Sequence, residues 1–112
     1  MIDFQKFLGG LFVGLVIVGG ASAADTPEFT LRIKNHKFEP AALTIPADTK
    51  VKLTIKNEDA TAEEFESHDF NREKVIPGGK QGVVFVGPLK PGAYKFFGEF
   101  HPETAQGVLT VK

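Results

Sequence analysis

Two short segments gather several side chains that could bind a metal ion. The first, Glu63–Phe70 (EEFESHDF), combines carboxylates with a histidine, and the second places Glu99 two residues before His101. Carboxylate oxygen and imidazole nitrogen are suitable ligands for Cu(II), Fe(II) and Fe(III). The two segments together predict a metal site, and a solvated acidic loop is the alternative. The predicted ligands are Glu64, Glu66, His68, Glu99 and His101.

Other charged residues near these segments are interpreted differently. The stretch from Glu58 to Glu73 is strongly acidic, and Arg72 is its only lysine or arginine. Like charges repel, so such a stretch destabilises the fold unless a cation or hydrogen bonds offset the repulsion. His36 is either a further ligand or a loop histidine that caps a turn. Four acidic residues are predicted to be solvated charges: Glu63, Asp69, Glu73 and Glu103.

The elements that must position these residues are β-strands. Apolar and polar residues alternate with period two, and prolines and glycines separate the alternating runs. Short strands at this spacing predict an all-β fold, a β-sandwich with Greek-key connections. The clearest predicted strands are residues 29–34, 51–56, 80–86, 94–100 and 107–111.

The segment 64–70 can be read in two ways. As a strand, it places Glu64, Glu66 and His68 on one face, with Phe65 and Ser67 on the other. As a helix opened by a capping box, it keeps Glu64 and His68 together at i, i+4 but moves Glu66 away. No apolar stripe follows the capping box, which favours the strand.

The late strand is predicted to continue past Phe100. Alternation then places Glu99 and His101 on one face, before Pro102 ends the hydrogen-bonding ladder. Four phenylalanines are expected in the core, where they could also form a dry wall around a site: Phe65, Phe96, Phe97 and Phe100.

The N-terminus predicts export. Residues 1–23 resemble a signal peptide, with an apolar run at 8–20 and Ala21-Ser22-Ala23 before the cleavage point. The alternative is a membrane anchor, but the apolar run is shorter than the roughly 20 residues that a span requires. We therefore expect a periplasmic domain, residues 24–112, with no membrane span after cleavage.

Composition excludes several classes of function. The chain has no cysteine, so it can form neither a disulfide nor a thiolate–metal bond. The net charge is −1, and no basic stripe is present that would bind nucleic acid. Ser67, His68 and Asp69 are adjacent in sequence, and adjacent strand residues point to opposite faces, so no hydrolytic triad is predicted.

Several motifs resemble those of the cupredoxin family. They are Phe38-x-Pro40, the turn LKPGAY and the closing H-P-x-x-x-x-G-x-L-x-V. The family's late motif reads Tyr-x-Phe-x-Cys, then His, then Met. Tyr94, Phe96 and His101 match it, whereas Gly98 stands at the cysteine and no methionine follows. The resemblance implies a cupredoxin-like Greek-key sandwich with His68 as the upstream histidine, and it excludes a blue copper site.

Residues 38–67 and 90–112 show a closer resemblance, to the cupredoxin-like domain of EfeO-type proteins and to the stand-alone periplasmic cupredoxin of ferrous-iron uptake systems. Glu64-Phe65-Glu66 resembles the acidic-aromatic-acidic triplet of that domain. The resemblance implies binding of copper(II) or iron and assistance in ferrous-iron oxidation and uptake. The expected partners are an inner-membrane iron permease and other periplasmic iron-uptake components.

Two other functions remain open. One is a metal-free β-sandwich that docks a membrane transporter by its acidic edge. The other is a copper carrier, although Cu(I) prefers the sulfur ligands that the mature chain lacks. If the protein takes part in catalysis, the sequence predicts at most a redox accessory in ferrous-iron oxidation.

Overall fold

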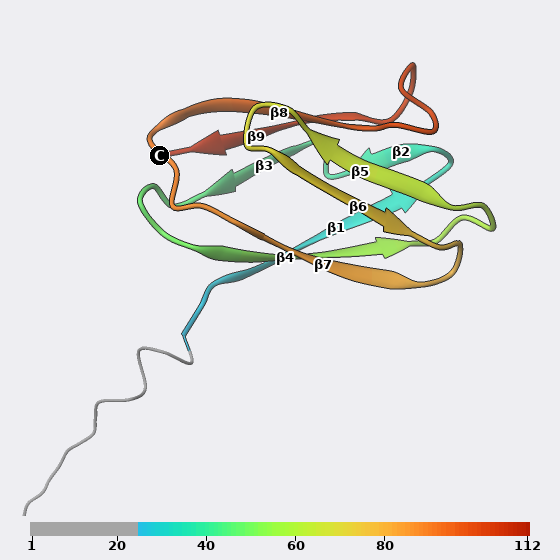
Figure 1. The fold of residues 1–112 in the computed structure, drawn as a ribbon, viewed down its shortest axis with the longest axis horizontal. Coiled ribbons are helices and arrows are strands. Elements are labelled where there is room, and N and C mark those ends of the chain that lie inside the picture. The colour runs from blue at the N-terminus through green and yellow to red at the C-terminus, as the bar shows by residue number, and fades with distance from the viewer. Residues whose placement is uncertain (1–24) are drawn as a thin grey trace, which may run out of the picture.

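The chain folds into two β-sheets that pack face to face (Figure 1). The computed structural model describes residues 25–112, so the predicted signal peptide, residues 1–23, lies outside it. The four-stranded sheet has the order β2 (Lys37–Glu39), β1 (Glu28–Lys34), β4 (Val51–Asn57) and β7 (Gln81–Val86). The five-stranded sheet has the order β3 (Ala42–Ile45), β9 (Gln106–Val111), β8 (Gly92–Gly98), β5 (Glu63–Ser67) and β6 (Arg72–Ile76).

Strand directions confirm the predicted all-β sandwich. β1 pairs with β4 and β3 pairs with β9 in parallel, and the remaining pairs are antiparallel. Non-consecutive strands are therefore neighbours, which requires the crossing connections of a Greek key. Within the described residues, no helix has the length and hydropathy that a membrane crossing requires.

Three strands have no predicted counterpart. β2 is only three residues long, and β3 is confined between Pro40 and Pro46. In β6 every residue except Ile76 is exposed, so the strand has no apolar alternation to detect. The unpredicted strand β6 is important because it contributes a residue to the acidic cluster described below.

β5 confirms the strand interpretation of the ambiguous segment and excludes the helix. Glu63, Phe65 and Ser67 are buried between the sheets, whereas Glu64 and Glu66 are half-buried on the outer face. The strand ends at Ser67, so His68 lies in the turn that follows.

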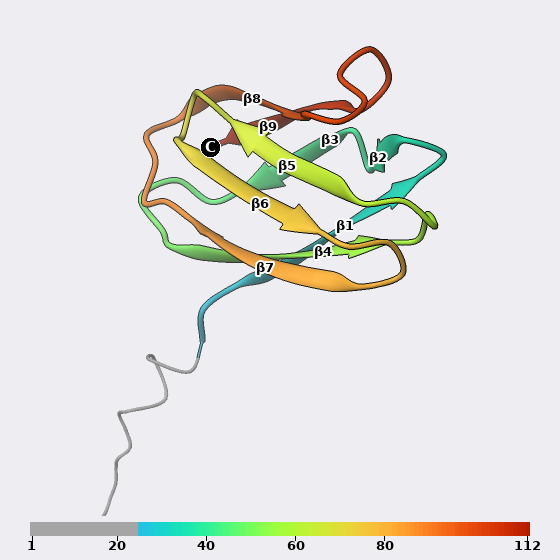
Figure 2. The same ribbon diagram turned by 45° about the vertical axis from the view of Figure 1, so that its right-hand side comes forward.

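β8 ends earlier than predicted, at Gly98. The His101 N–H donates to the Gly98 carbonyl at 3.1 Å, and the Ala105 N–H donates to the His101 carbonyl at 2.8 Å. These local bonds curl residues 99–105 into a loop, which we call the β8–β9 loop (Figure 2). The expectation of strand alternation through His101 was therefore wrong. Phe100 is 48% exposed and Phe97 is half-buried on the outer face. The prediction that these two residues belong to the core was therefore wrong.

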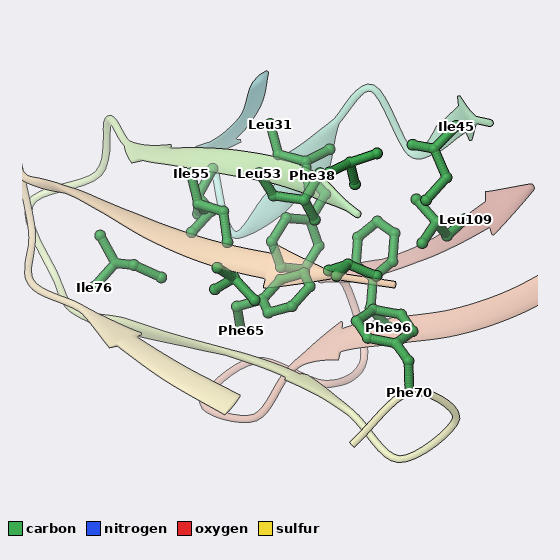
Figure 3. Packing of buried hydrophobic residues seen from close by; sticks show 14 of the residues in the cluster. Leu31, Phe38, Ile45, Leu53, Ile55, Phe65, Phe70, Ile76, Phe96 and Leu109 are labelled. Carbon is green, nitrogen blue, oxygen red and sulfur yellow. The ribbon is translucent and has the colours of Figure 1, made fainter. Parts of the chain in front are cut away.

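Aromatic side chains form the centre of the core (Figure 3). The ring of Phe96 lies 5.1 Å from that of Phe38 and 5.3 Å from that of Phe65, measured between centroids. Phe70 packs against Phe65 at 6.2 Å. Tilted and edge-on contacts of this kind stabilise a core beyond the burial of area alone. They also pack residues of β5 and β8 against each other, and candidate site residues lie on β5 and just after β8.

Candidate metal centre

Three carboxylates converge on the outer face of the five-stranded sheet. Glu64 and Glu66 lie on β5, and Glu73 on β6 is the cross-strand partner of Glu66. One oxygen from each lies within 4.8 Å of the others. We call Glu64, Glu66 and Glu73 the outer-face cluster. Sequence reasoning missed Glu73 because it missed β6.

The pKa of Glu64 reflects the electrostatic repulsion within this cluster. A side-chain hydrogen bond with Glu73 raises the pKa of the Glu64 carboxyl above its ordinary value. Desolvation and the charges of Glu73, Glu66 and Glu99 raise this pKa further. The carboxylates therefore repel one another at neutral pH, and a bound cation would relieve that repulsion.

Two more predicted residues lie beside the cluster. His68 Nε2 is 3.2 Å from a Glu66 oxygen, and its ring meets Phe97 edge-on at 5.3 Å. The Glu99 N–H donates to the Glu64 carbonyl at 2.8 Å. The structure thus brings four of the five predicted ligands to one face of the molecule: Glu64, Glu66, His68 and Glu99.

No lysine or arginine within residues 25–112 forms a salt bridge with the outer-face cluster. Arg72 is close in sequence, but its guanidinium donates to the carbonyls of Phe85 and Asn71, both at 2.9 Å. An open cleft of about 240 Å³ adjoins the cluster and is lined by Glu66, His68 and Glu73, among others. A hydrated cation could therefore reach the carboxylates.

The fifth predicted ligand, His101, has a different partner. Its Nδ1 lies 2.6 Å from Oε1 of Glu63, which is 1% exposed. Oε2 of Glu63 accepts hydrogen bonds from the N–H groups of Phe100 at 2.8 Å and Glu64 at 3.1 Å. The interpretation of Glu63 as a solvated charge was wrong. Starting the strand one residue earlier would have revealed this, because Glu63 then shares the inward face of Phe65.

His36 packs against one face of the His101 ring. The two imidazole rings stack with centroids 3.6 Å apart and planes 8° apart. His36 belongs to the two-residue turn between β1 and β2, where Asn35 and His36 have φ of 54° and 58°. The Thr104 hydroxyl donates to the His36 carbonyl at 2.7 Å, so the β8–β9 loop contacts this turn directly.

Asp59 fixes this turn. Its carboxylate accepts the N–H groups of Asn35 at 2.8 Å and His36 at 2.9 Å. Desolvation alone would raise the pKa of Asp59. The two backbone hydrogen bonds and the nearby His36 and His101 outweigh it, so the pKa of Asp59 lies below its ordinary value.

This lowered pKa predicts a pH dependence of stability. A carboxyl whose pKa is lowered by folding stabilises the protein above its unfolded pKa of about 4, and that contribution disappears as pH falls through the folded pKa. We expect Asp59→Asn to lower the free energy of unfolding at pH 7 by about 1 kcal/mol and to flatten its decline below pH 4. Urea unfolding at pH 7 and pH 3 measures both effects.

The control is Asp48→Asn, which changes an exposed turn aspartate paired only with Lys90 at 3.5 Å. It should leave the acid dependence unchanged. Equal acid dependence in wild type and Asp59→Asn would contradict the assignment to Asp59.

Several known structures of similar shape are described as blue copper proteins or cupredoxins. Auracyanin A, a blue copper protein from Chloroflexus aurantiacus, matches with a TM-score of 0.68 and 15% identity, over 79% of this chain and 100% of that one. A purple cupredoxin from Nitrosopumilus maritimus matches with a TM-score of 0.58 and 25% identity, over 74% of this chain and 98% of that one. The fold is thus that of the cupredoxins.

Sequence comparison gives the family. The sequence model of the cupredoxin-like domain matches residues 8–111, and the chain belongs to this family. RP394, an uncharacterized protein of Rickettsia prowazekii (strain Madrid E), is 48% identical over 84 residues, which are 75% of this chain and 67% of that protein.

The residues of this chain do not fit a blue copper ion. Such a centre needs a cysteine thiolate, and the chain has no cysteine. Gly98, which stands at the cysteine of the family's late motif, offers no side chain. The Nδ1 of His101 already bonds to Glu63. A metal site on this fold must therefore use other donors, and the outer-face cluster offers them.

Proposed function

We propose that this cupredoxin-like protein binds iron or Cu(II) on the outer face of its five-stranded sheet and assists ferrous-iron uptake. One observation carries the proposal: oxygens of Glu64, Glu66 and Glu73 lie within 4.8 Å of one another with no lysine or arginine of the described chain bridging them. His68 and Glu99 are the adjacent groups that would complete the coordination.

The chemistry of these donors selects among metals and oxidation states. Oxygen ligands suit hard cations, and one imidazole is acceptable to Cu(II) and to both oxidation states of iron. Several negative charges stabilise Fe(III) more than Fe(II), because the attraction grows with the charge of the ion. Bound Fe(II) would thus lose its electron more readily to an external acceptor such as dioxygen. The same preference for higher charge disfavours Cu(I), which weakens the case for a Cu(I) carrier.

Iron is the substrate in this proposal, and a membrane permease is the proposed recipient. The resemblance of residues 38–67 and 90–112 to the cupredoxins of ferrous-iron uptake systems supports this partner. The signal-peptide-like residues 1–23 support a periplasmic location. Together they favour capture of iron outside the inner membrane, followed by transfer to the permease.

The test is a titration of purified residues 24–112 by calorimetry. Cu(II), Mn(II), Zn(II) and, without oxygen, Fe(II) are added separately, and the copper sample is also studied by EPR. We expect one saturable site with oxygen and nitrogen ligands and no intense blue absorption. Binding no stronger than that of a generic acidic surface would reject the proposal in favour of a metal-free docking module.

A further inference from the structure

The position of Glu63 leads to a second conclusion, which concerns the inward face of β5. A Cβ atom built on Gly98 would lie 2.7 Å from both Cδ and Oε2 of Glu63, and 2.7 Å from Cβ of Ala105. The volume that a residue-98 side chain would need is thus already filled by the Glu63 carboxylate. Any thiolate at this position would have to displace that carboxylate.

Both oxygens of the Glu63 carboxylate also have hydrogen-bond partners within the protein, so this buried carboxylate is satisfied without a metal ion. Oε1 faces Nδ1 of His101 at 2.6 Å, and Oε2 accepts two backbone N–H groups. A carboxylate only accepts hydrogen bonds, so with Glu63 ionised the proton lies on Nδ1 of His101, and this nitrogen has no lone pair for a metal. Nε2 is the ring nitrogen that keeps a lone pair. The stacked ring of His36 shields the His101 imidazole on one face.

These contacts join separate parts of the chain. Glu63 belongs to β5, whereas Phe100 and His101 belong to the β8–β9 loop. The carboxylate therefore cross-links a strand and a loop that have no covalent connection nearby. Removing one partner of a buried charged pair is strongly destabilising, so a variant that disrupts this cross-link should lose stability.

We infer that the Glu63–His101 pair replaces a copper ion at the loop end of this fold and cross-links β5 to the β8–β9 loop without metal. The place of the family's cysteine is accordingly filled by the Glu63 carboxylate, and a metal ion cannot be held there through Nδ1 of His101. The inference is independent of whether the outer-face cluster binds a metal, and it predicts that Glu63 affects stability rather than metal affinity.

The experiment compares Glu63→Gln with a variant in which the three residues of the outer-face cluster are all changed to glutamine. Thermal unfolding is recorded with and without one equivalent of Cu(II), and Cu(II) affinity is measured by calorimetry. Glu63→Gln should lower the midpoint by about 10 °C or more without copper. It should keep Cu(II) affinity within twofold of wild type. Glu103→Gln, in the same loop, is the control and should change neither quantity.

The outcomes separate the two proposals. If the outer-face variant still binds Cu(II) and Glu63→Gln abolishes binding, Glu63 is a ligand and the inference is overturned. If neither variant nor wild type binds a metal while Glu63→Gln loses stability, the inference holds and the proposed function fails. A midpoint of Glu63→Gln equal to that of wild type would also overturn the inference, whatever the metal results.

Discussion

Changing both Glu64 and Glu66 to glutamine is expected to weaken Fe(III) and Cu(II) binding at least 100-fold. The substitution removes two negative charges from a site where oxygens of three carboxylates lie within 4.8 Å of one another. Loss of a single supporting group near a metal commonly lowers affinity 10- to 100-fold, and two direct ligands should cost at least that much. Competition with a chelator of known affinity measures the change.

The same double substitution should make the metal-free protein more stable. The pKa of Glu64 is raised, so the apo fold loses stability as pH rises through that pKa. Without the repelling charges this loss should disappear, and the variant should unfold at a higher temperature than wild type at pH 7. Glu39→Gln, which removes an exposed carboxylate on β2, is the matched control. Unchanged affinity in the double variant would show that the metal binds elsewhere.

Gly98→Ala is expected to lower the free energy of unfolding by about 3 kcal/mol, judging from the combined cost of overpacking and of a disturbed buried hydrogen bond. The new methyl group would lie 2.7 Å from the Glu63 carboxylate and from Cβ of Ala105. Both neighbours are buried, so neither can move into solvent. Urea unfolding measures the loss.

Gly82→Ala provides the control for this glycine. Gly82 also lies in a strand, β7, and its added Cβ would approach no atom closer than 3.2 Å, the nearest belonging to the side chains of Ile76 and Lys74. We expect a change below about 1 kcal/mol there. A Gly98→Ala loss no greater than that of Gly82→Ala would contradict the packing of Glu63 against Gly98.

The all-β fold could be predicted from the sequence because apolar and polar residues alternate regularly in the clearest strands. Val51–Lys56 has an apolar residue at every second position, and the structure buries those positions in β4. The Phe38-x-Pro40 and LKPGAY motifs pointed to the family that the sequence comparison confirms. β6 was beyond prediction, because a strand at the sheet edge needs few apolar residues.

The arrangement of the site was only partly predictable. Alternation along β5 correctly placed Glu64 and Glu66 on one face. Alternation along β8 could not reveal that this strand ends at Gly98, because the end depends on local backbone hydrogen bonds within the β8–β9 loop. His101 therefore turned toward Glu63 rather than toward the outer face, and only the three-dimensional structure places these two residues together.

The neighbours Glu63 and Glu64 have a consequence for how insertions and deletions would act. A one-residue slip of β5 would put Glu64 in the buried place of Glu63, one glutamate for another. It would also put Glu66 in the place of Phe65, which is fully buried against Phe38 and Phe96. The strand register is therefore fixed by the phenylalanine. Length changes in the segment between β4 and β5 should be tolerated only if they leave Phe65 in its place.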